Sequence, residues 1–339
     1  MTRIIPAATR TASNGIPLNH SRRHGWQVPA EWVVLVPGVV TGFNFATYAV
    51  AEPGEGVLVQ TPAYGPFQHV AEHLEMTQQT SQLQQDESGR YYVDLDAFEA
   101  AITPETRIFM LCNPHNPTGR VFTHDELLGI AEVCLRHGVW ICADEIHSDL
   151  VYSGYKHIPV ASLSEEIAAK TITLVAPSKT FNVPGLRGSA AIIPDVEVRK
   201  RFIEAQHGLM GGVNSLGQVA MQAAYEHGEP WLEALLDYLE ANRDYLSKFV
   251  ETRLPGVKMV APEGTYLAWL DCREMNLDTD ENAKFNPFFE EQAKVALNEG
   301  LWFGPGGEGF VRLNFGCPRA TLVEALERME GALEGALAG

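Results

Sequence analysis

The feature that most constrains the fold is the alternation of short apolar runs with helical patterns between Trp32 and about Pro194. Each apolar run is short enough for a buried strand, and amphipathic stretches lie between the runs. Strands that alternate with helices predict a mostly parallel sheet covered by helices on both faces. Ligands of such sheets bind beyond the carboxyl ends of the strands. Residues that directly follow a predicted strand are therefore the first candidates for a functional site.

Seven strands and five helices are predicted in this part of the chain, which gives an α/β fold with a seven-stranded, mostly parallel sheet. The strands are 32–36, 56–60, 77–83, 107–112, 139–143, 171–175 and 189–193. The helices are 41–51, 64–73, 95–101, 125–137 and 197–205. Thr123 and Glu126 form a capping-box pattern at the start of the fourth helix, and Gly138 ends it.

The second half of the chain has a different pattern. Apolar residues at helical spacing predict one long amphipathic helix over 229–253. Short strands at 257–260, 266–270, 301–303 and 310–315, a helix over 288–298 and a terminal helix from Arg319 are expected to follow. We therefore expect three parts: an N-terminal segment, a large α/β domain and a smaller C-terminal α+β domain. Their predicted bounds are 1–30, 31–230 and 231–339.

Composition excludes several classes of partner. The chain has 339 residues and a formal net charge of -18, which disfavours binding to nucleic acid or to anionic membrane surfaces. Its five cysteines include no Cys-x-x-Cys pair, so neither a disulfide framework nor a zinc site is indicated. The N-terminus has no apolar core of a secretory signal, and no apolar run is long enough for a membrane span. We expect a cytoplasmic protein without a metal.

Lys179 follows the predicted strand 171–175, in the segment Ala-Pro-Ser-Lys-Thr-Phe-Asn-Val-Pro-Gly-Leu-Arg-Gly. Schiff-base chemistry requires a lysine with a lowered pKa held beside a carbonyl group. Arg187, eight residues further on, is a candidate ligand of a phosphate. Taken alone, the segment is also compatible with a surface lysine in a polar loop.

Asp144 ends the apolar run 139–143 and is followed by Glu-Ile-His147-Ser-Asp. Pyridoxal 5'-phosphate (PLP) is an electron sink only while its pyridine nitrogen is protonated, and an acidic partner keeps it so. Asp144 is the candidate for that partner, and His147 is a candidate contact of the phenolic oxygen. A helix N-cap for Asp144 and a hydrogen-bonded polar residue for His147 are the structural alternatives.

Three further motifs also follow predicted strands. Asn116 lies in Asn-Pro-His-Asn-Pro-Thr-Gly, where two Asn-Pro steps make a rigid loop that presents its amide. Val39 and Val40 lie in a Pro-Gly-Val-Val turn that opens a helix, whose free N–H groups suit a phosphate. Tyr64, in Thr-Pro-Ala-Tyr-Gly-Pro, is a candidate to stack on a planar ring. An ordinary turn, for the first two, and a core aromatic, for Tyr64, are the alternatives.

Arg312 falls inside the apolar strand predicted near 310–315. A charge in such a place is costly unless it is paired. The α-carboxylate of a substrate suits the bidentate fork of a guanidinium, and a structural salt bridge is the alternative. Arg312 would add a carboxylate site from the small domain to the five strand-end motifs of the large one.

Taken together, these motifs resemble the fold-type I PLP enzymes, the class I/II aminotransferases. Within them the sequence is most similar to the MalY/PatB group of cystathionine β-lyases, or C–S lyases, from about Arg22 to the C-terminus. His147 is the strongest marker of this group, since many plain aminotransferases have Tyr at that position. The motifs that carry the resemblance are residues 37–40, 113–119, 144–149, 178–182, 262–267 and 306–319.

The resemblance implies a role for each candidate residue. Lys179 would bind PLP covalently and then act as the base, and Asp144 would pair with the pyridinium. Asn116 and His147 would contact the phenolic oxygen, and Tyr64 would stack on the ring. Arg312 would bind the substrate carboxylate, and a homodimer is implied. The phosphate would be held by Val39, Val40, Ser178 and Arg187.

The sequence departs from this family pattern in two places. Ala176 stands three residues before the lysine, where relatives often have a phosphate-binding serine. Relatives also carry several dozen more residues ahead of the Arg-His-Gly-Trp block at 23–26, with a tyrosine that reaches the partner subunit's phosphate. Residues 1–20 contain no tyrosine, so 1–30 is expected to be an atypical, shortened segment.

The leading functional hypothesis is β-elimination from L-cystathionine or another cysteine S-conjugate, which yields a thiol, pyruvate and ammonia. The same residues also suit an aminotransferase that passes an amino group to a 2-oxo acid. A third possibility is a PLP-fold binding or regulatory protein with weak turnover. The motifs do not choose among these three.

Overall fold

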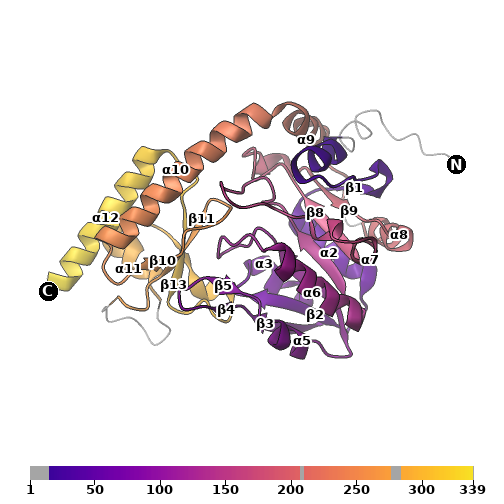
Figure 1. Ribbon diagram of the computed structural model, residues 1–339, viewed down its shortest axis with the longest axis horizontal. Coiled ribbons are helices and arrows are strands. Elements are labelled where there is room, and N and C mark those ends of the chain that lie inside the picture. The colour runs from indigo at the N-terminus through magenta and orange to yellow at the C-terminus, as the bar shows by residue number, and fades with distance from the viewer. Residues whose placement is uncertain (1–14, 207–209, 276–283, 339) are drawn as a thin grey trace.

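The computed structural model describes residues 15–206, 210–275 and 284–338. Residues 1–14, part of the predicted N-terminal segment, lie outside these ranges. The larger sheet has the strand order β1-β9-β8-β7-β6-β2-β3 (Figure 1). Its strands are β1 (Val33–Val36), β2 (Gly56–Thr61), β3 (Thr77–Gln82), β6 (Thr106–Cys112), β7 (Trp140–Asp144), β8 (Thr171–Val175) and β9 (Ser189–Ile192). All seven predicted strands are thus confirmed.

Strands β3, β2, β6, β7 and β8 pair in parallel, whereas β9 is antiparallel to both β8 and β1. Consecutive residues of the central strands enter different cores, as Met110 and Leu111 of β6 do. One core also contains residues of α2 (Val39–Val50), α4 (Val70–His73) and α8 (Val196–Ala205). The other contains residues of α5 (Leu95–Ala100), α6 (His124–His137) and α7 (Glu165–Ala169). The sheet is therefore covered on both faces, as the alternation of the sequence predicts.

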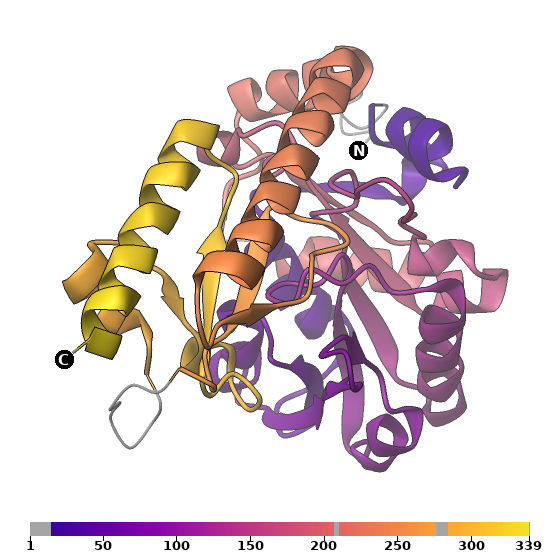
Figure 2. The same ribbon diagram turned by 60° about the vertical axis from the view of Figure 1, so that its left-hand side comes forward.

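A second, antiparallel sheet has the order β10-β11-β13-β12. It is formed by β10 (Lys258–Met259), β11 (Leu267–Asp271), β12 (Asn298–Glu299) and β13 (Phe310–Asn314). Helices α10 (Glu229–Arg253) and α12 (Arg319–Ala338) lie side by side over it (Figure 2). The predicted long helix over 229–253 is confirmed. The two sheets agree with an α/β part followed by a smaller α+β part, while the domain bounds stay predictions.

Two predicted elements of the second half are wrong. The helix over 288–298 is replaced by α11 (Asn286–Phe288), a π-turn (Phe289–Ala293) and extended chain that reaches β12. The side chain of Asn286 accepts a hydrogen bond from the Leu297 amide at 2.8 Å, so a side chain takes the place of helical bonds. The predicted strand at 301–303 is a 3₁₀ turn, η6 (Gly300–Phe303).

Shorter elements complete the fold. The predicted helix 64–73 is divided at His69 into α3 (Gly65–Gln68) and α4. Helix α9 (Ser215–His227) and α7 were not predicted. A hairpin of β4 (Gln84–Gln85) and β5 (Tyr91–Tyr92) lies between β3 and α5, and short turns include η1 (His20–His24), η2 (Ala30–Trp32), η3 (Val160–Ser162) and η4 (Pro184–Leu186).

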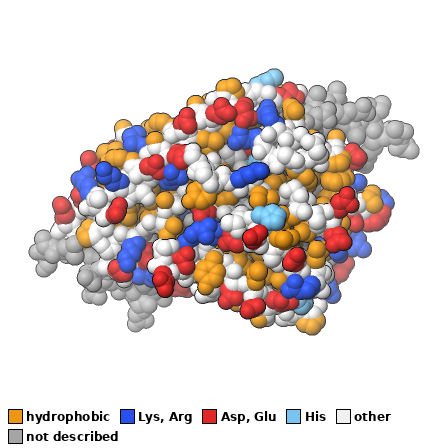
Figure 3. Space-filling view, viewed as in Figure 1, with side chains coloured by type: hydrophobic (Ala, Val, Ile, Leu, Met, Phe, Trp, Pro, Cys, Tyr) orange, Lys and Arg blue, Asp and Glu red, His pale blue; other side chains and the backbone are white. Residues whose placement is uncertain are grey.

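Acidic and basic side chains are interspersed over the face of the molecule shown in Figure 3. Within the described ranges, no helix is both long enough and apolar enough to cross a bilayer. The same residues contain no group of His, Cys, Asp and Glu side chains arranged to hold a metal ion.

Candidate active site

A cavity of about 390 Å³ lies at the carboxyl edge of the larger sheet, where β13 of the smaller sheet closes it. All ten residues singled out from the sequence line this cavity. They are Val39, Val40, Tyr64, Asn116, Asp144, His147, Ser178, Lys179, Arg187 and Arg312. The structure thus brings the six motifs together, while the role of each residue remains a prediction.

Asp144 and Lys179 form the electrostatic centre of the cavity. They follow two adjacent strands of the sheet, since Asp144 ends β7 and Lys179 lies in the loop after β8. Burial raises the pKa of the Asp144 carboxyl to about 7, although the Ile146 amide at 3.0 Å and the nearby Lys179 oppose this rise. Burial also lowers the pKa of the Lys179 amine. A buried acid and a partly buried amine of lowered pKa are the groups that proton transfer at neutral pH requires.

One end of the cavity is suited to a phosphate. Helix α2 begins there without a side-chain cap, so the N–H groups of its first turn are free to bind an anion. Gly38 precedes the helix with a φ of 110°, a conformation that favours glycine. Arg187 also lines the cavity and has a φ of 51°, which is costly for a residue with a side chain. Such local backbone strain makes the loop between β8 and β9 a candidate ligand-binding loop.

Arg312, at the other end, is a partly buried cation with polar but uncharged partners. Its Nη1 donates to the Asn116 Oδ1 at 2.8 Å, and its Nη2 donates to the Asn298 Oδ1 at 2.5 Å. Its Nε is buried and has no hydrogen-bond partner in the part of the chain that the structure describes. A carboxylate is the group that such a guanidinium lacks.

Aromatic and imidazole rings form the walls between the two ends. His147 is buried and lies edge-on to Tyr266, with 6.0 Å between the ring centroids. Burial, together with the nearby charges of Lys179 and Arg312, lowers the pKa of His147 to about 3, so its ring is neutral. Burial raises the pKa of the Tyr64 phenol, which is half-buried in the wall. These rings give the cavity flat, uncharged sides that suit a planar cofactor.

Sequence analysis missed several residues of this cavity. Thr41, Ser189, Tyr266 and Asn314 line it, and Asn298 lies behind Arg312. The Ser189 hydroxyl joins the phosphate end to the sheet, because it accepts from the Gly38 amide at 2.7 Å and donates to the Val36 carbonyl at 2.8 Å. Tyr266 stands inside a motif that was noted only as a family marker, so its position after a turn was the available signal.

A buried charge network holds the loops on which Asn116 and Tyr266 lie. The Arg120 side chain is almost fully buried, and its Nε donates to Glu263 at 3.0 Å. The backbone amides of Glu263 and Gly264 both donate to the Gly119 carbonyl, at 2.8 and 3.0 Å. We call Arg120, Glu126 and Glu263 the Arg120 clamp. It joins a loop that follows β6 to the loop that precedes β11.

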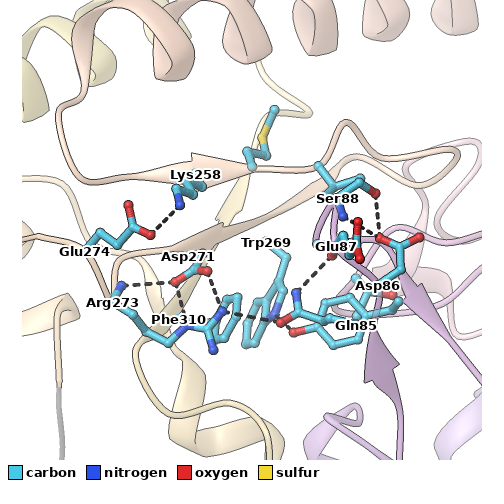
Figure 4. Close-up of a pocket in the computed structure, with 15 residues that line it drawn as sticks. Gln85, Asp86, Glu87, Ser88, Lys258, Trp269, Asp271, Arg273, Glu274 and Phe310 are labelled. Carbon is cyan, nitrogen blue, oxygen red and sulfur yellow. Dashed lines mark hydrogen bonds and ion pairs between the residues drawn. The ribbon is translucent and has the colours of Figure 1, made fainter.

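A second cavity, of about 490 Å³, lies between the β4–β5 hairpin and the smaller sheet. Figure 4 shows the Trp269 and Phe310 rings in it beside the ion pair of Arg273 and Asp271. Its two basic side chains already have acidic partners, since Lys258 pairs with Glu274. Among its described lining residues, this cavity therefore has no cation like Arg312, whose charge is not paired with a carboxylate in the first cavity.

Comparison with known proteins agrees with this geometry. The model of the family "Aminotransferase class I and II" matches residues 17–329. The chain belongs to this family. The cystathionine β-lyase PatB of Bacillus subtilis is 44% identical over 317 residues, which cover 92% of this chain and 80% of PatB. Protein MalY of Escherichia coli is 37% identical over 92% of this chain and 79% of its own.

A solved structure of a family member has the same fold. Cystalysin from Treponema denticola, crystallised with a PLP cofactor, superposes with a TM-score of 0.92 at 32% identity. The match covers 96% of this chain and 82% of the cystalysin chain. The predicted family, with its PLP-dependent transferase fold, is therefore confirmed.

Proposed function

We propose that this protein is a PLP-dependent C–S β-lyase that cleaves L-cystathionine or a related cysteine S-conjugate. The proposal combines the similarity to PatB with one observation of the cavity. A partly buried lysine, a buried aspartic acid and an uncompensated arginine converge on one space that is open to a small amino acid. The substrate therefore belongs to the class of amino acids with a free α-carboxylate and a sulfur at the β-carbon.

The residues of this cavity fit PLP. Asp144, whose pKa is raised to about 7, gains a cationic partner if a pyridinium nitrogen lies beside it. The uncapped first turn of α2, together with Ser178 and Arg187, provides the donors that a phosphate needs. The buried Nδ1 of His147 has no partner among the described residues, so it is free for a polar atom of a ligand. The hydroxyl missing at Ala176 has candidate substitutes in Thr41 and Ser178, which line the same end.

When bound, PLP supplies an electron sink for negative charge at the Cα of an amino acid. Arg312 holds the substrate carboxylate and thereby fixes which bond at Cα faces Lys179. The amine of Lys179, kept neutral more readily by its lowered pKa, takes the proton from Cα. Asp144 stays beside the ring nitrogen and keeps it protonated. Water completes the overall reaction, in which cystathionine gives homocysteine, pyruvate and ammonia.

The test is an assay of the purified protein with PLP and L-cystathionine. Pyruvate and free thiol should appear in equal amounts, and Lys179→Ala should abolish both as well as the visible absorbance band of the bound cofactor. Amino transfer to a 2-oxo acid without pyruvate would show an aminotransferase instead. A cofactor band that does not respond to any amino acid would show a binding protein.

We also propose that the protein is a cytoplasmic homodimer. Helix α2, which begins at the phosphate end, exposes Val40 and Tyr48, and helix α9 exposes Leu216 to 72% and Val219 to 58%. Helix α9 packs against η4 of the Lys179 loop, because a Cβ on Gly217 would lie 2.5 Å from the Leu186 carbonyl. A second copy of the chain that covers these apolar side chains would support the phosphate loops, and sedimentation equilibrium would measure its mass.

A further inference from the structure

Three elements approach the Arg312 guanidinium from different sides. We call their contact residues Asn116, Asn298 and Phe303 the Arg312 seat. Asn116 comes from the loop after β6, and Asn298 is the cross-strand neighbour of Arg312 on β12. The ring of Phe303 in η6 lies under the guanidinium, with its centroid 4.9 Å from the Cζ atom. Each partner offers an oxygen or a π face, and none carries a negative charge.

The ring under Arg312 is itself held by an aromatic stack. Trp269 meets Phe303 edge-on at 5.2 Å and stacks on Phe310 at 5.1 Å with an angle of 5° between the planes. Figure 4 shows the far end of this stack, where Arg273 caps the Phe310 ring. These three buried rings in a row, with Arg273 over the last of them, leave little freedom for Phe303 to move. The guanidinium above it is therefore fixed in direction as well as in place.

Asn298 is the partner with the greatest consequence for binding. An asparagine oxygen can orient an arginine without neutralising it, whereas a carboxylate in the same place would form a bidentate pair. The residue directly after it is Glu299, whose carboxylate binds the amides of Asn286 and Gly300 instead of Arg312. The acid of this strand thus points to the backbone and the amide points to the guanidinium.

We propose that Asn298 is a positioning residue that makes Arg312 specific for amino acids with a free α-carboxylate, with Phe303 as the support of the seat. This inference rests on the proposed function. Asn298 holds one Nη group and leaves the positive charge uncompensated, so that the substrate carboxylate supplies the missing anion. The carboxylate would bind the free Nε and the Nη hydrogens that Asn116 and Asn298 leave unused.

The experiment compares Asn298→Asp with Asn298→Ala in the PLP-loaded enzyme. The aspartate supplies an internal carboxylate at the guanidinium, so the KM for cystathionine should rise about 30-fold or more, with a much smaller change in kcat. The alanine variant keeps the charge but loosens its orientation, and its KM should rise about threefold to tenfold. The absorbance band of the bound cofactor should be the same in both variants and in the parent.

Two controls separate this role from a general effect of charge or folding. Gln292→Glu makes the same chemical change at an exposed amide of the same part of the chain, and its KM should equal that of the parent. A cystathionine analogue that lacks the α-carboxylate should be a poor substrate for the parent and should lose nothing further in Asn298→Asp. An equal loss for both substrates, or an unchanged KM in Asn298→Asp, would overturn the proposal. If the parent itself releases no pyruvate, the proposed function fails instead.

Discussion

Arg120, which is buried, and Arg312, which is partly buried, both join the carboxyl edge of the larger sheet to the smaller sheet, yet they are paired in opposite ways. Arg120 has carboxylate partners in Glu126 at 2.8 Å and Glu263 at 3.0 Å. Among the residues that the structure describes, the partners of Arg312 are the amides of Asn116 and Asn298 and the ring of Phe303. One cation is neutralised where it lies, and the other is held in place without being neutralised.

The difference separates structure from binding. Burial of a charge is costly, and the Arg120 clamp offsets that cost with two carboxylates. The positive charge of Arg120 is therefore already paired and does not attract a ligand. Arg312 keeps an unsatisfied Nε and its full charge, which a ligand can satisfy. We therefore expect that loss of Arg120 will affect the folded state, whereas loss of Arg312 will affect catalysis.

The largest expected effect is that of Arg120→Met on stability. Removal of the cation takes from Glu126 its ion-pair partner and leaves Glu263 to the partly exposed Arg90 at 2.9 Å, and breaking a buried pair in this way costs about 3–5 kcal/mol. Urea unfolding followed by fluorescence should show this loss. Arg107→Met is the matched control, because the pair of Arg107 with Glu55 is 41% and 25% exposed, and loss of such a surface pair costs about 1 kcal/mol or less. Equal losses in the two variants would contradict a special role for the clamp.

The next effect is that of Arg312→Lys on turnover. A lysine keeps the charge but not the planar fork that Asn116, Asn298 and a carboxylate share, so kcat/KM should fall about 100-fold. The midpoint of thermal unfolding should stay within about 2 °C of the parent, since no buried carboxylate is left alone. Steady-state kinetics and a thermal melt on one preparation give both numbers. A large loss of stability with normal turnover would reverse the comparison with Arg120.

The two arginines also show what a sequence can reveal. Arg312 stands out because a charge inside an apolar strand is conspicuous, and the five strand-end motifs stand out because parallel strands bring their carboxyl ends to one edge. In the sequence, Arg120 follows Gly119 in a loop and looks like an ordinary surface residue. Its partner Glu263 lies 143 positions away, so nothing near Arg120 indicates that it is paired. Pairings over such distances leave no local pattern, and for the same reason Asn298 and Tyr266 were missed.

The secondary structure follows the same division. Six of the seven strands of the larger sheet are largely apolar runs, and the sequence places them to within a residue or two because local hydrophobicity determines them. The edge strand β3 is polar, with the sequence Thr-Gln-Gln-Thr-Ser-Gln, so hydrophobicity does not determine it. The segment 288–298 has helical spacing but does not form the predicted helix. Asn286 there accepts the Leu297 amide, and Glu299 accepts the Asn286 amide. These bonds depend on how the chain turns around β12, which periodicity alone does not record.

The smallest effect concerns Asp144, a buried acid. Unlike Arg120 it has, among the described residues, no partner of opposite charge in an ion pair, and unlike Arg312 it is not held by side-chain amides. Its pKa is about 7 in the folded, cofactor-free protein and 3.8 as the reference value, because burial disfavours the carboxylate. Between these two values the folded protein binds a proton that the unfolded chain has released. The stability of the cofactor-free protein should therefore fall as the pH rises, by about 2 kcal/mol between pH 5 and pH 7.

Asp144→Asn isolates this contribution, because the amide has the same shape and does not titrate. Urea unfolding of the cofactor-free protein at pH 5 and pH 7 should give a smaller difference in the variant than in the parent. PLP should reduce the difference in the parent as well, since a pyridinium beside Asp144 favours the carboxylate that burial disfavours. If the parent and Asp144→Asn had the same pH dependence, Asp144 would be charged without a partner, and the assignment of this residue to the ring nitrogen would lose its electrostatic basis.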